Sequence, residues 1–63
     1  MCESNVYLKE NNVEKLIMEN VAVITPGDKG IFVLKGLLGE RMEVQGTIED
    51  INLMRNKIIL QAQ

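Results

Sequence analysis

The sequence predicts an all-β fold, a small and strongly bent antiparallel barrel of the SH3-like kind with five to six short strands. Three observations lead to this prediction. Short apolar, β-branched segments recur along the chain, and tight-turn residues separate them. No segment combines the length and the periodicity of a helix. A long alternating segment carries Gly46 on its inward side, where a missing side chain lets a strand bend sharply or bulge.

The first part of the chain predicts a strand, a turn and a second extended segment. Residues 2–8 alternate between the two sides of the chain and predict a half-buried strand. Residues 9–12 are polar and end in two asparagines, which tolerate left-handed backbone angles, so they predict a turn. Residues 13–18 suit a helical face as well as a short strand, but six residues are too few for a stable helix. We therefore expect this segment to be extended.

A hairpin is the clearest local pattern in the sequence. Residues 21–25 form an apolar, β-branched run that predicts a strand buried on both faces. Pro26 presets the first central angle of a turn, and Gly27 is expected to supply the positive φ that follows. Residues 31–35 then predict a second strand, which we expect to pair with the first in antiparallel orientation.

The remainder of the chain predicts the other arm of the barrel. Leu37 and Leu38 lie between two glycines, and we expect them either to cap the core or to form a dimer or partner surface. From Glu40 the alternation is clear. Its inward positions are Met42, Val44, Gly46 and Ile48. Residues 50–53 end this arm, residues 54–57 predict a turn and residues 58–61 a last strand, after which Ala62 and Gln63 are expected to fray.

The length of 63 residues predicts a single domain, residues 1–63, with a marginal core. Ordering the chain costs on the order of 95 kcal/mol at about 1.5 kcal/mol per residue, and the apolar area that so short a chain buries offsets this only narrowly. Small domains of this kind depend on disulfides, metals or oligomerisation. One cysteine allows no internal disulfide. The sequence therefore favours a homodimer.

Charge and composition disfavour nucleic acid and membrane. The net charge is −2, and the seven basic residues are spread from Lys9 to Lys57 without forming a patch. Only one Phe and one Tyr are available to stack on bases. No apolar run approaches the roughly 18 residues of a membrane span. The first residues do not resemble a signal peptide, and a free thiol suits a reducing compartment, so we expect a cytoplasmic protein.

The sequence predicts no enzymatic activity. It contains no histidine, so a nucleophilic Cys2 would have no imidazole base, and Glu3 lies on the opposite side of the predicted strand. The glycines match no phosphate-binding loop. Glu49 and Asp50 are neighbours at a strand end, so their side chains diverge and are expected to be surface charge. The four methionines form no local cluster and are expected to fill the core.

Cys2 is the one residue that points to a chemical role. A thiolate and the backbone nitrogen of the same residue together chelate a metal, and the terminal amine lies one residue away on Met1, or on Cys2 itself if Met1 is removed. Sulfur and nitrogen donors suit Ni(II) or Cu(II). One cysteine cannot complete such a site, whereas two copies of the chain can. Alternatively, Cys2 is a small buried hydrophobic residue without a chemical role.

The whole chain also resembles a known family. The resemblance is carried by the start Met1-Cys2, residues 6–8, the strand over residues 21–25 with its turn, and the closing patterns over residues 46–53 and 57–60. On these residues the chain is similar to the CooT family of small nickel-binding accessory proteins. The resemblance implies a homodimer of SH3-like barrels. It further implies a Ni(II) site at the dimer contact, built from both copies of Cys2 with Met1 as a backbone neighbour.

In functional terms the resemblance implies a metallochaperone that supplies nickel to carbon monoxide dehydrogenase, with that enzyme or its other maturation proteins as partners. A general nickel store, or a partner of another metalloenzyme, fits the same residues. A second hypothesis is a non-catalytic SH3/Lsm-like binding module for RNA or a protein, in which Cys2 is incidental. The acidic composition and the scarcity of aromatic residues weigh against RNA.

Overall fold

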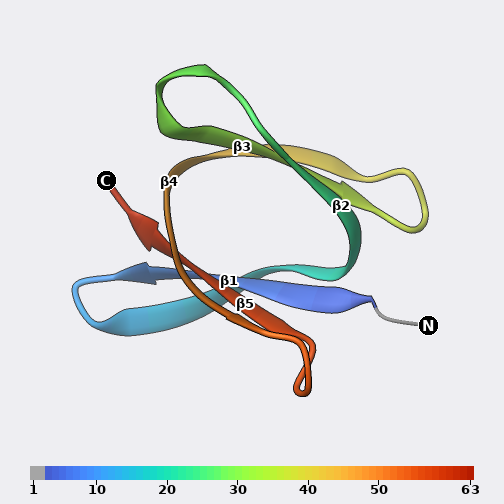
Figure 1. Ribbon diagram of the computed structural model, residues 1–63, viewed down its shortest axis with the longest axis horizontal. Coiled ribbons are helices and arrows are strands. Elements are labelled where there is room, and N and C mark those ends of the chain that lie inside the picture. Colours follow the sequence, from blue (N-terminus) through green and yellow to red (C-terminus); the bar gives the residue numbers. More distant parts are fainter. Residues whose placement is uncertain (1–2) are drawn as a thin grey trace.

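The computed structural model describes residues 3–63, which form one closed, barrel-like sheet of five strands. The strands are β1 (Ser4–Glu10), β2 (Val13–Pro26), β3 (Ile31–Gly36), β4 (Arg41–Asn52) and β5 (Lys57–Ala62), and a short 3-10 turn, η1 (Asp28–Gly30), precedes β3. They follow one another around the sheet in chain order (Figure 1). The predicted all-β barrel is confirmed, with the smaller of the two expected strand numbers.

The sheet closes through a parallel pair. β1 pairs with β5 from Asn5 opposite Lys57 to Lys9 opposite Gln61, whereas each of the pairs β1–β2, β2–β3, β3–β4 and β4–β5 is antiparallel. When an odd number of strands is joined by successive reversals, the first and the last strand run in the same direction. The predicted antiparallel pattern therefore describes the consecutive pairs, and the closing pair follows from the strand count.

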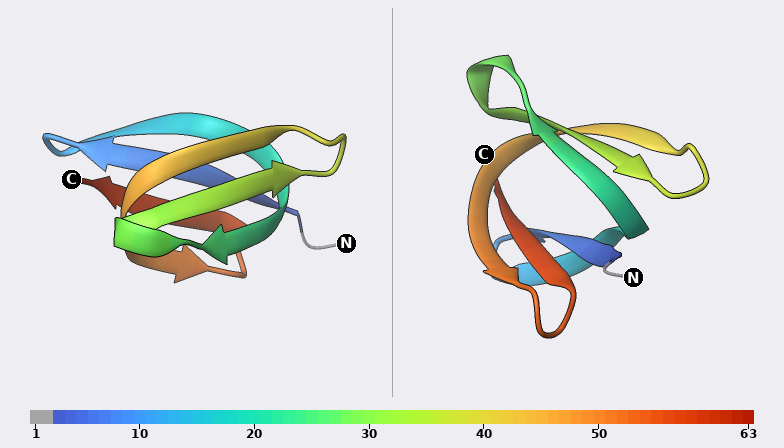
Figure 2. Two further views of the ribbon diagram at one scale, coloured as in Figure 1. Left: turned by 90° about the horizontal axis from the view of Figure 1, so that it is seen from above. Right: turned by 45° about the vertical axis from the view of Figure 1, so that its right-hand side comes forward.

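β2 is a long, bent strand that pairs with two neighbouring strands (Figure 2). Its first part pairs with β1 and its last part with β3, and Val21 takes part in both pairings. The register shifts between Val21 and Val23, and Asn20 has a positive φ of 54°. Residues 13–18 are thus extended, as predicted.

In the same strand, the predicted burial of residues 21–25 on both faces is wrong. Val21 is buried, but Val23 is 48% exposed. The reason is that β2 belongs to a single closed sheet, in which one face looks into the barrel and the other looks outward. An apolar run here does not indicate burial on both faces.

The β2–β3 hairpin forms with the predicted pairing but a different turn. Ile24 lies opposite Leu34, and Thr25 opposite Val33. Gly27 has a φ of −116°, and the positive φ angles belong to Lys29 and Gly30. Pro26 is still paired with a β3 residue, so the chain reverses later than expected, through η1.

The core lies inside the barrel and is aliphatic. Val6, Leu34 and Leu60 are fully buried at its centre. Around them lie the buried residues Val21, Val44 and Ile58 and the half-buried residues Leu8, Ile17, Met18, Ile24, Phe32 and Met42. Core filling is thus confirmed for Met18 and Met42. It is wrong for Met54, which is 96% exposed at a turn, and Met1 lies outside the described residues.

Gly46 takes its predicted inward position in β4, where the backbone of β5 approaches closely. A Cβ atom added at Gly46 would collide with the carbonyl oxygen of Gln61. The expected bulge occurs slightly later, because the β4–β5 register shifts between Ile48 and Asp50. Ala62 was expected to fray, but it pairs with Gly46 as the last residue of β5.

Candidate functional site

The start of β1 is where the candidate metal ligand joins the barrel. Cys2 and its neighbour Met1 lie outside the described residues. Ser4 is buried and pairs with Val21, so the chain is held in the sheet from that residue onward. The candidate ligand precedes this point by two residues in the sequence.

Asn5 hydrogen-bonds to two other segments at this end of the barrel, the β4–β5 turn and the middle of β2. Its backbone N–H donates to the carbonyl oxygen of Asn56 at 2.8 Å, and its side-chain oxygen accepts from the N–H of Asn20 at 3.2 Å. The carbonyl oxygen of Asn20 in turn accepts from the N–H of Leu37 at 3.1 Å. The start of β1 is thereby connected both to the β4–β5 turn and to the β3–β4 loop.

The sequence analysis did not identify this network. The sequence feature that could have indicated this network is the pair Asn20 and Asn56, because asparagine tolerates left-handed backbone angles. Their φ angles are 54° and 52°. What the sequence could not indicate is that the two residues meet the side chain and backbone of Asn5, because the three are far apart in the chain.

Two apolar loop tips flank the start of β1. Leu37 and Leu38 in the β3–β4 loop are 47% and 90% exposed, and Leu53 in the β4–β5 turn is 73% exposed beside Met54. In Figure 1 the β3–β4 loop lies on the same side of the barrel as the start of β1, and the β4–β5 turn projects at the bottom. Core capping, one of the two roles expected for the leucine pair, is therefore excluded for Leu38. We call Leu37, Leu38, Leu53 and Met54 the amino-terminal rim.

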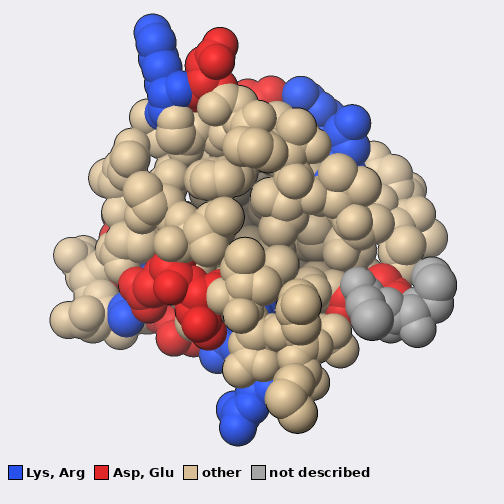
Figure 3. Space-filling view, viewed as in Figure 1, with Lys and Arg blue, Asp and Glu red and all other residues tan. Residues whose placement is uncertain are grey.

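Both loop tips are held by local hydrogen bonds. The N–H of Leu38 donates to the carboxylate of Glu40 at 3.1 Å, and the N–H of Gly39 donates to the carbonyl oxygen of Gly36 at 3.2 Å. In the turn, the N–H of Arg55 donates to the side-chain oxygen of Asn52 at 3.1 Å. The rim leucines and Met54 are therefore presented to solvent by defined turns. In Figure 3 the right-hand edge of the molecule, where the β3–β4 loop lies, is mostly uncharged.

Glu3, the residue after the candidate ligand in the sequence, has a buried carboxylate oxygen, Oε2, without a hydrogen-bond partner among residues 3–63. Leaving a buried acceptor unpaired costs about 1–3 kcal/mol, and more for a charged group. A cation or an N–H donor at this end of the barrel would remove that cost.

Residues 3–63 contain no group of three or more His, Cys, Asp or Glu side chains arranged to hold a metal ion. Glu49 is paired with Lys9 at 3.1 Å, as expected for surface charge. Side chains of these four types therefore indicate no metal centre within residues 3–63.

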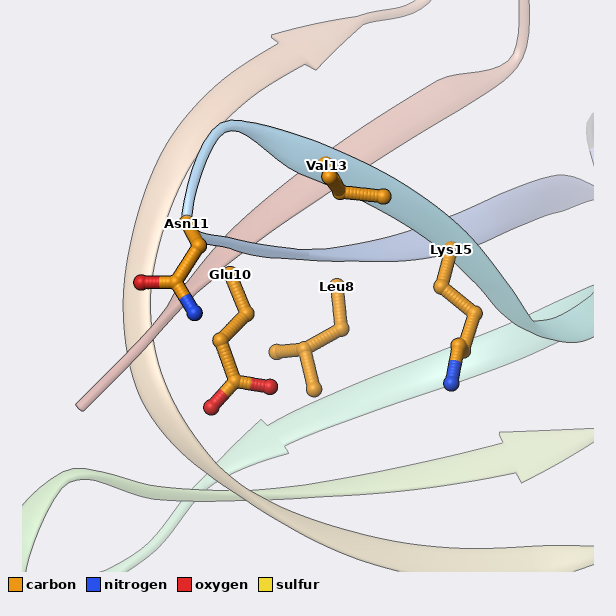
Figure 4. Close-up of a pocket in the computed structure, with 5 residues that line it drawn as sticks. All are labelled: Leu8, Glu10, Asn11, Val13 and Lys15. Atoms are coloured by element: carbon orange, nitrogen blue, oxygen red, sulfur yellow. The ribbon is translucent and has the colours of Figure 1, made fainter.

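A shallow pocket lies at the other end of β1 and is not a second candidate. It measures about 250 Å³ and is lined by Leu8, Glu10, Asn11, Val13 and Lys15 of the β1–β2 hairpin (Figure 4). Small-molecule sites are larger, about 300–1,000 Å³, and combine several convergent polar groups. With a single carboxylate this pocket offers no metal site.

The two aromatic residues both have neighbours in the barrel. The ammonium group of Lys57 lies over one face of the Tyr7 ring, 4.7 Å from the ring centroid, and 3.0 Å from the carboxylate of Glu14. Phe32 packs half-buried against the core. Lys and Arg side chains are scattered in Figure 3 and form no basic patch on that face. In the described part of the chain, no helix is long and apolar enough to cross a membrane.

One comparison with known proteins identifies a family, and another identifies a solved structure with the same fold. The family model for the CO dehydrogenase accessory protein CooT matches residues 1–61. The fold is also that of the crystal structure of a candidate CooT from Carboxydothermus hydrogenoformans. The two share a TM-score of 0.90 and 24% sequence identity, over 98% of this chain and 98% of that chain. Comparison with curated proteins finds no match. This chain belongs to the CooT family of CO dehydrogenase accessory proteins.

Proposed function

We propose that this protein binds Ni(II) and acts as a metallochaperone in the maturation of CO dehydrogenase. The observation that carries the proposal is the position of the only cysteine, Cys2, in a chain that belongs to a CO dehydrogenase accessory family. Nickel is then cargo that the protein passes on, and the protein itself is not an enzyme. The absence of histidine from the sequence agrees with a non-catalytic role.

The proposed site holds one Ni(II) between two chains. Each chain contributes the thiolate of Cys2 and a terminal backbone nitrogen, from Cys2 itself or from Met1. A planar arrangement of thiolate and nitrogen donors suits Ni(II) as well as Cu(II). One chain supplies too few such donors, and residues 3–63 offer no alternative cluster. The homodimer is therefore part of the proposed site.

Two features of the described residues support a cation at this end of the barrel. Ser4 pairs with Val21 in the sheet, so a strand begins two residues after Cys2 in the sequence. The buried carboxylate oxygen of Glu3 has no partner among residues 3–63 and would be stabilised by positive charge nearby. A thiolate site further suits the reducing cytoplasm.

RNA binding receives no comparable support. Single-strand binders need exposed aromatic rings and concentrated positive charge. Here Lys57 lies over one face of the Tyr7 ring, and the net charge is −2.

A nickel titration by calorimetry tests the proposal, comparing the natural chain with Cys2→Ser. We expect one Ni(II) per two chains, a thiolate-to-nickel charge-transfer absorption, and loss of both in Cys2→Ser. Because position 2 precedes the first strand in the sequence, the circular dichroism of the variant should not change. Glu10→Gln, at the other end of β1, is the matched control and should bind as the natural chain does. Undiminished binding by Cys2→Ser would refute the proposal.

A further inference from the structure

The first residues of β2 pair with a neighbouring strand on one side only. Residues 13–16 pair with β1, from Val13 opposite Glu10 to Leu16 opposite Tyr7, without a change of register. β3 joins β2 only from Val21 onward, and within residues 3–63 no other strand pairs with residues 13–16. Closure of the sheet thus leaves the second side of this stretch open, with backbone N–H and C=O groups directed to solvent. We call residues 13–16 with their open side the β2 edge.

The side chains of the β2 edge are exposed as well. Val13 is 63% exposed and Leu16 42% exposed, and the two residues between them are also at the surface. Two other strand stretches that pair on one side only are less regular or poorer in donors. The last part of β2 ends at Pro26, which has no backbone N–H, and the second half of β4 is interrupted by the register shift between Ile48 and Asp50. The β2 edge is therefore the one best suited to accept a further strand.

The shallow pocket of about 250 Å³ lies beside the β2 edge. Val13 and Lys15 of the edge contribute to its lining (Figure 4). Both are on the face of the strand that looks into the barrel, because Lys15 lies opposite Leu8, which packs against the core. A volume of this size is too small for a typical small-molecule ligand but accommodates one aliphatic side chain.

We propose that the β2 edge is a docking site for an extended segment of nickel-free CO dehydrogenase, which adds to β2 as a further strand and places an apolar side chain in the pocket. The proposal rests on the proposed function, in which that enzyme receives the metal. The natural complement of an open strand edge is another extended peptide, because it carries N–H and C=O groups at the same spacing. In this mode of recognition the main-chain hydrogen bonds provide affinity, and pockets for alternate side chains provide specificity. The edge and the pocket supply both.

Charge and position define the docked segment further. Glu10 and Lys15 line the pocket, and neither takes part in an ion pair within residues 3–63. They can pair with charged side chains of the segment, so we expect its apolar residue to have charged neighbours. The pocket lies at the end of β1 opposite Ser4, about 20 Å away at 3.3 Å per residue. A segment bound there leaves the start of β1 free for the metal ligands of two chains.

The affinity of variants for nickel-free CO dehydrogenase of the same organism, measured by surface plasmon resonance, tests the proposal. Val13→Arg places a long charged side chain at the pocket and should weaken binding at least tenfold. Val23→Arg is the matched control, because Val23 is apolar and 48% exposed in the same strand but outside the β2 edge. It should bind within about twofold of the natural chain. Circular dichroism checks that both variants fold, as expected for exposed positions.

Hydrogen–deuterium exchange of the natural chain with and without the enzyme locates the contact. Amides within residues 13–16 should exchange more slowly in the complex, because N–H groups on the open side become hydrogen-bonded. Protection that is confined to other parts of the chain would overturn the proposal. So would the failure of the natural chain to bind the nickel-free enzyme at micromolar concentrations.

A nickel titration of the same samples separates this proposal from the proposed function. Val13→Arg should take up one Ni(II) per two chains, as the natural chain does. If nickel binds and Val13→Arg binds the enzyme as tightly as the natural chain, the docking proposal is wrong and the nickel function stands. If the enzyme binds at the β2 edge but neither protein takes up nickel, the docking proposal stands and the nickel function fails.

Discussion

The backbone N–H of Asn5 donates to the carbonyl oxygen of Asn56 at 2.8 Å, directly before the first residue pair of β1 and β5. This bond carries the parallel pairing of the two strands one step further toward the amino terminus. Because Asn5 lies three residues after Cys2, the bond helps to determine where the proposed metal-binding end of the chain leaves the sheet.

The side chain of Asn5 gives the first prediction. Asn5→Ala removes the acceptor for the N–H of Asn20 and should lower the free energy of unfolding by about 0.5–1.5 kcal/mol. Amide exchange at Asn20 should accelerate as well, which NMR can follow residue by residue. Asn5→Asp is the control, because it keeps an acceptor oxygen at the same place. If Asn5→Ala leaves both stability and exchange unchanged, the side-chain link does not hold the segments together.

Gly46 gives a second prediction. In Gly46→Ala the new Cβ would meet the carbonyl oxygen of Gln61, which is backbone and cannot rotate away. We expect a loss of about 1–3 kcal/mol in urea unfolding, typical of overpacking. Gly27→Ala is the matched control, because Gly27 has a negative φ and a more distant nearest neighbour. An equal loss in the two variants would contradict the close approach of β4 and β5.

Lys57 gives a third prediction, on the outer face of the barrel. Glu14→Gln breaks a partly exposed ion pair and should cost less than about 1 kcal/mol, a difference that salt should reduce. Lys57→Ala also uncovers the ring of Tyr7 and should cost more than Glu14→Gln. Unfolding measured at low and high salt separates the two contributions. A loss in Lys57→Ala that salt abolishes entirely would rule out the packing contribution.

The pH dependence of nickel binding is the fourth prediction. An ordinary cysteine thiol has a pKa near 8.5 and binds metal as the thiolate. Metal must therefore displace protons, and falling pH favours the protonated, metal-free form. With two thiolates per Ni(II), the apparent affinity should fall by roughly a hundredfold per pH unit below that pKa, and more steeply if a backbone amide also loses its proton. Calorimetry in buffers of different ionisation enthalpy counts the protons released. Release of no protons would exclude thiolate ligation.

Metal selectivity is the fifth prediction. The Irving–Williams order places Cu(II) above Ni(II) for a site with sulfur and nitrogen donors. Cu(II) should therefore displace Ni(II) in a competition titration followed by the nickel–thiolate absorption. Zn(II) should displace it less readily than Cu(II), because it prefers a tetrahedral arrangement. Retention of Ni(II) against excess Cu(II) would contradict a site of this simple donor set.

Much of the fold was predictable because alternation and turn residues are local signals. The pairing of residues 21–25 with residues 31–35, the inward position of Gly46 and the extended conformation of residues 13–18 all follow from side chains that are close in the sequence. Cys2 likewise stands out by type and position alone. The sequence by itself thus determined the strand content, the principal hairpin and the candidate ligand.

Only the tertiary structure decided how the sheet closes and what surrounds the start of β1. The exposure of Val23 and the pairing of Ala62 with Gly46 depend on strands that are distant in the sequence. So does the link from Asn5 to Asn20 and Asn56, which brings the two apolar turns to one end of the barrel. Alternation states which side of a strand a residue occupies, but not which strand lies beside it or whether that side is covered. For this reason the candidate ligand could be named from the sequence, whereas the surface beside the start of β1 could not.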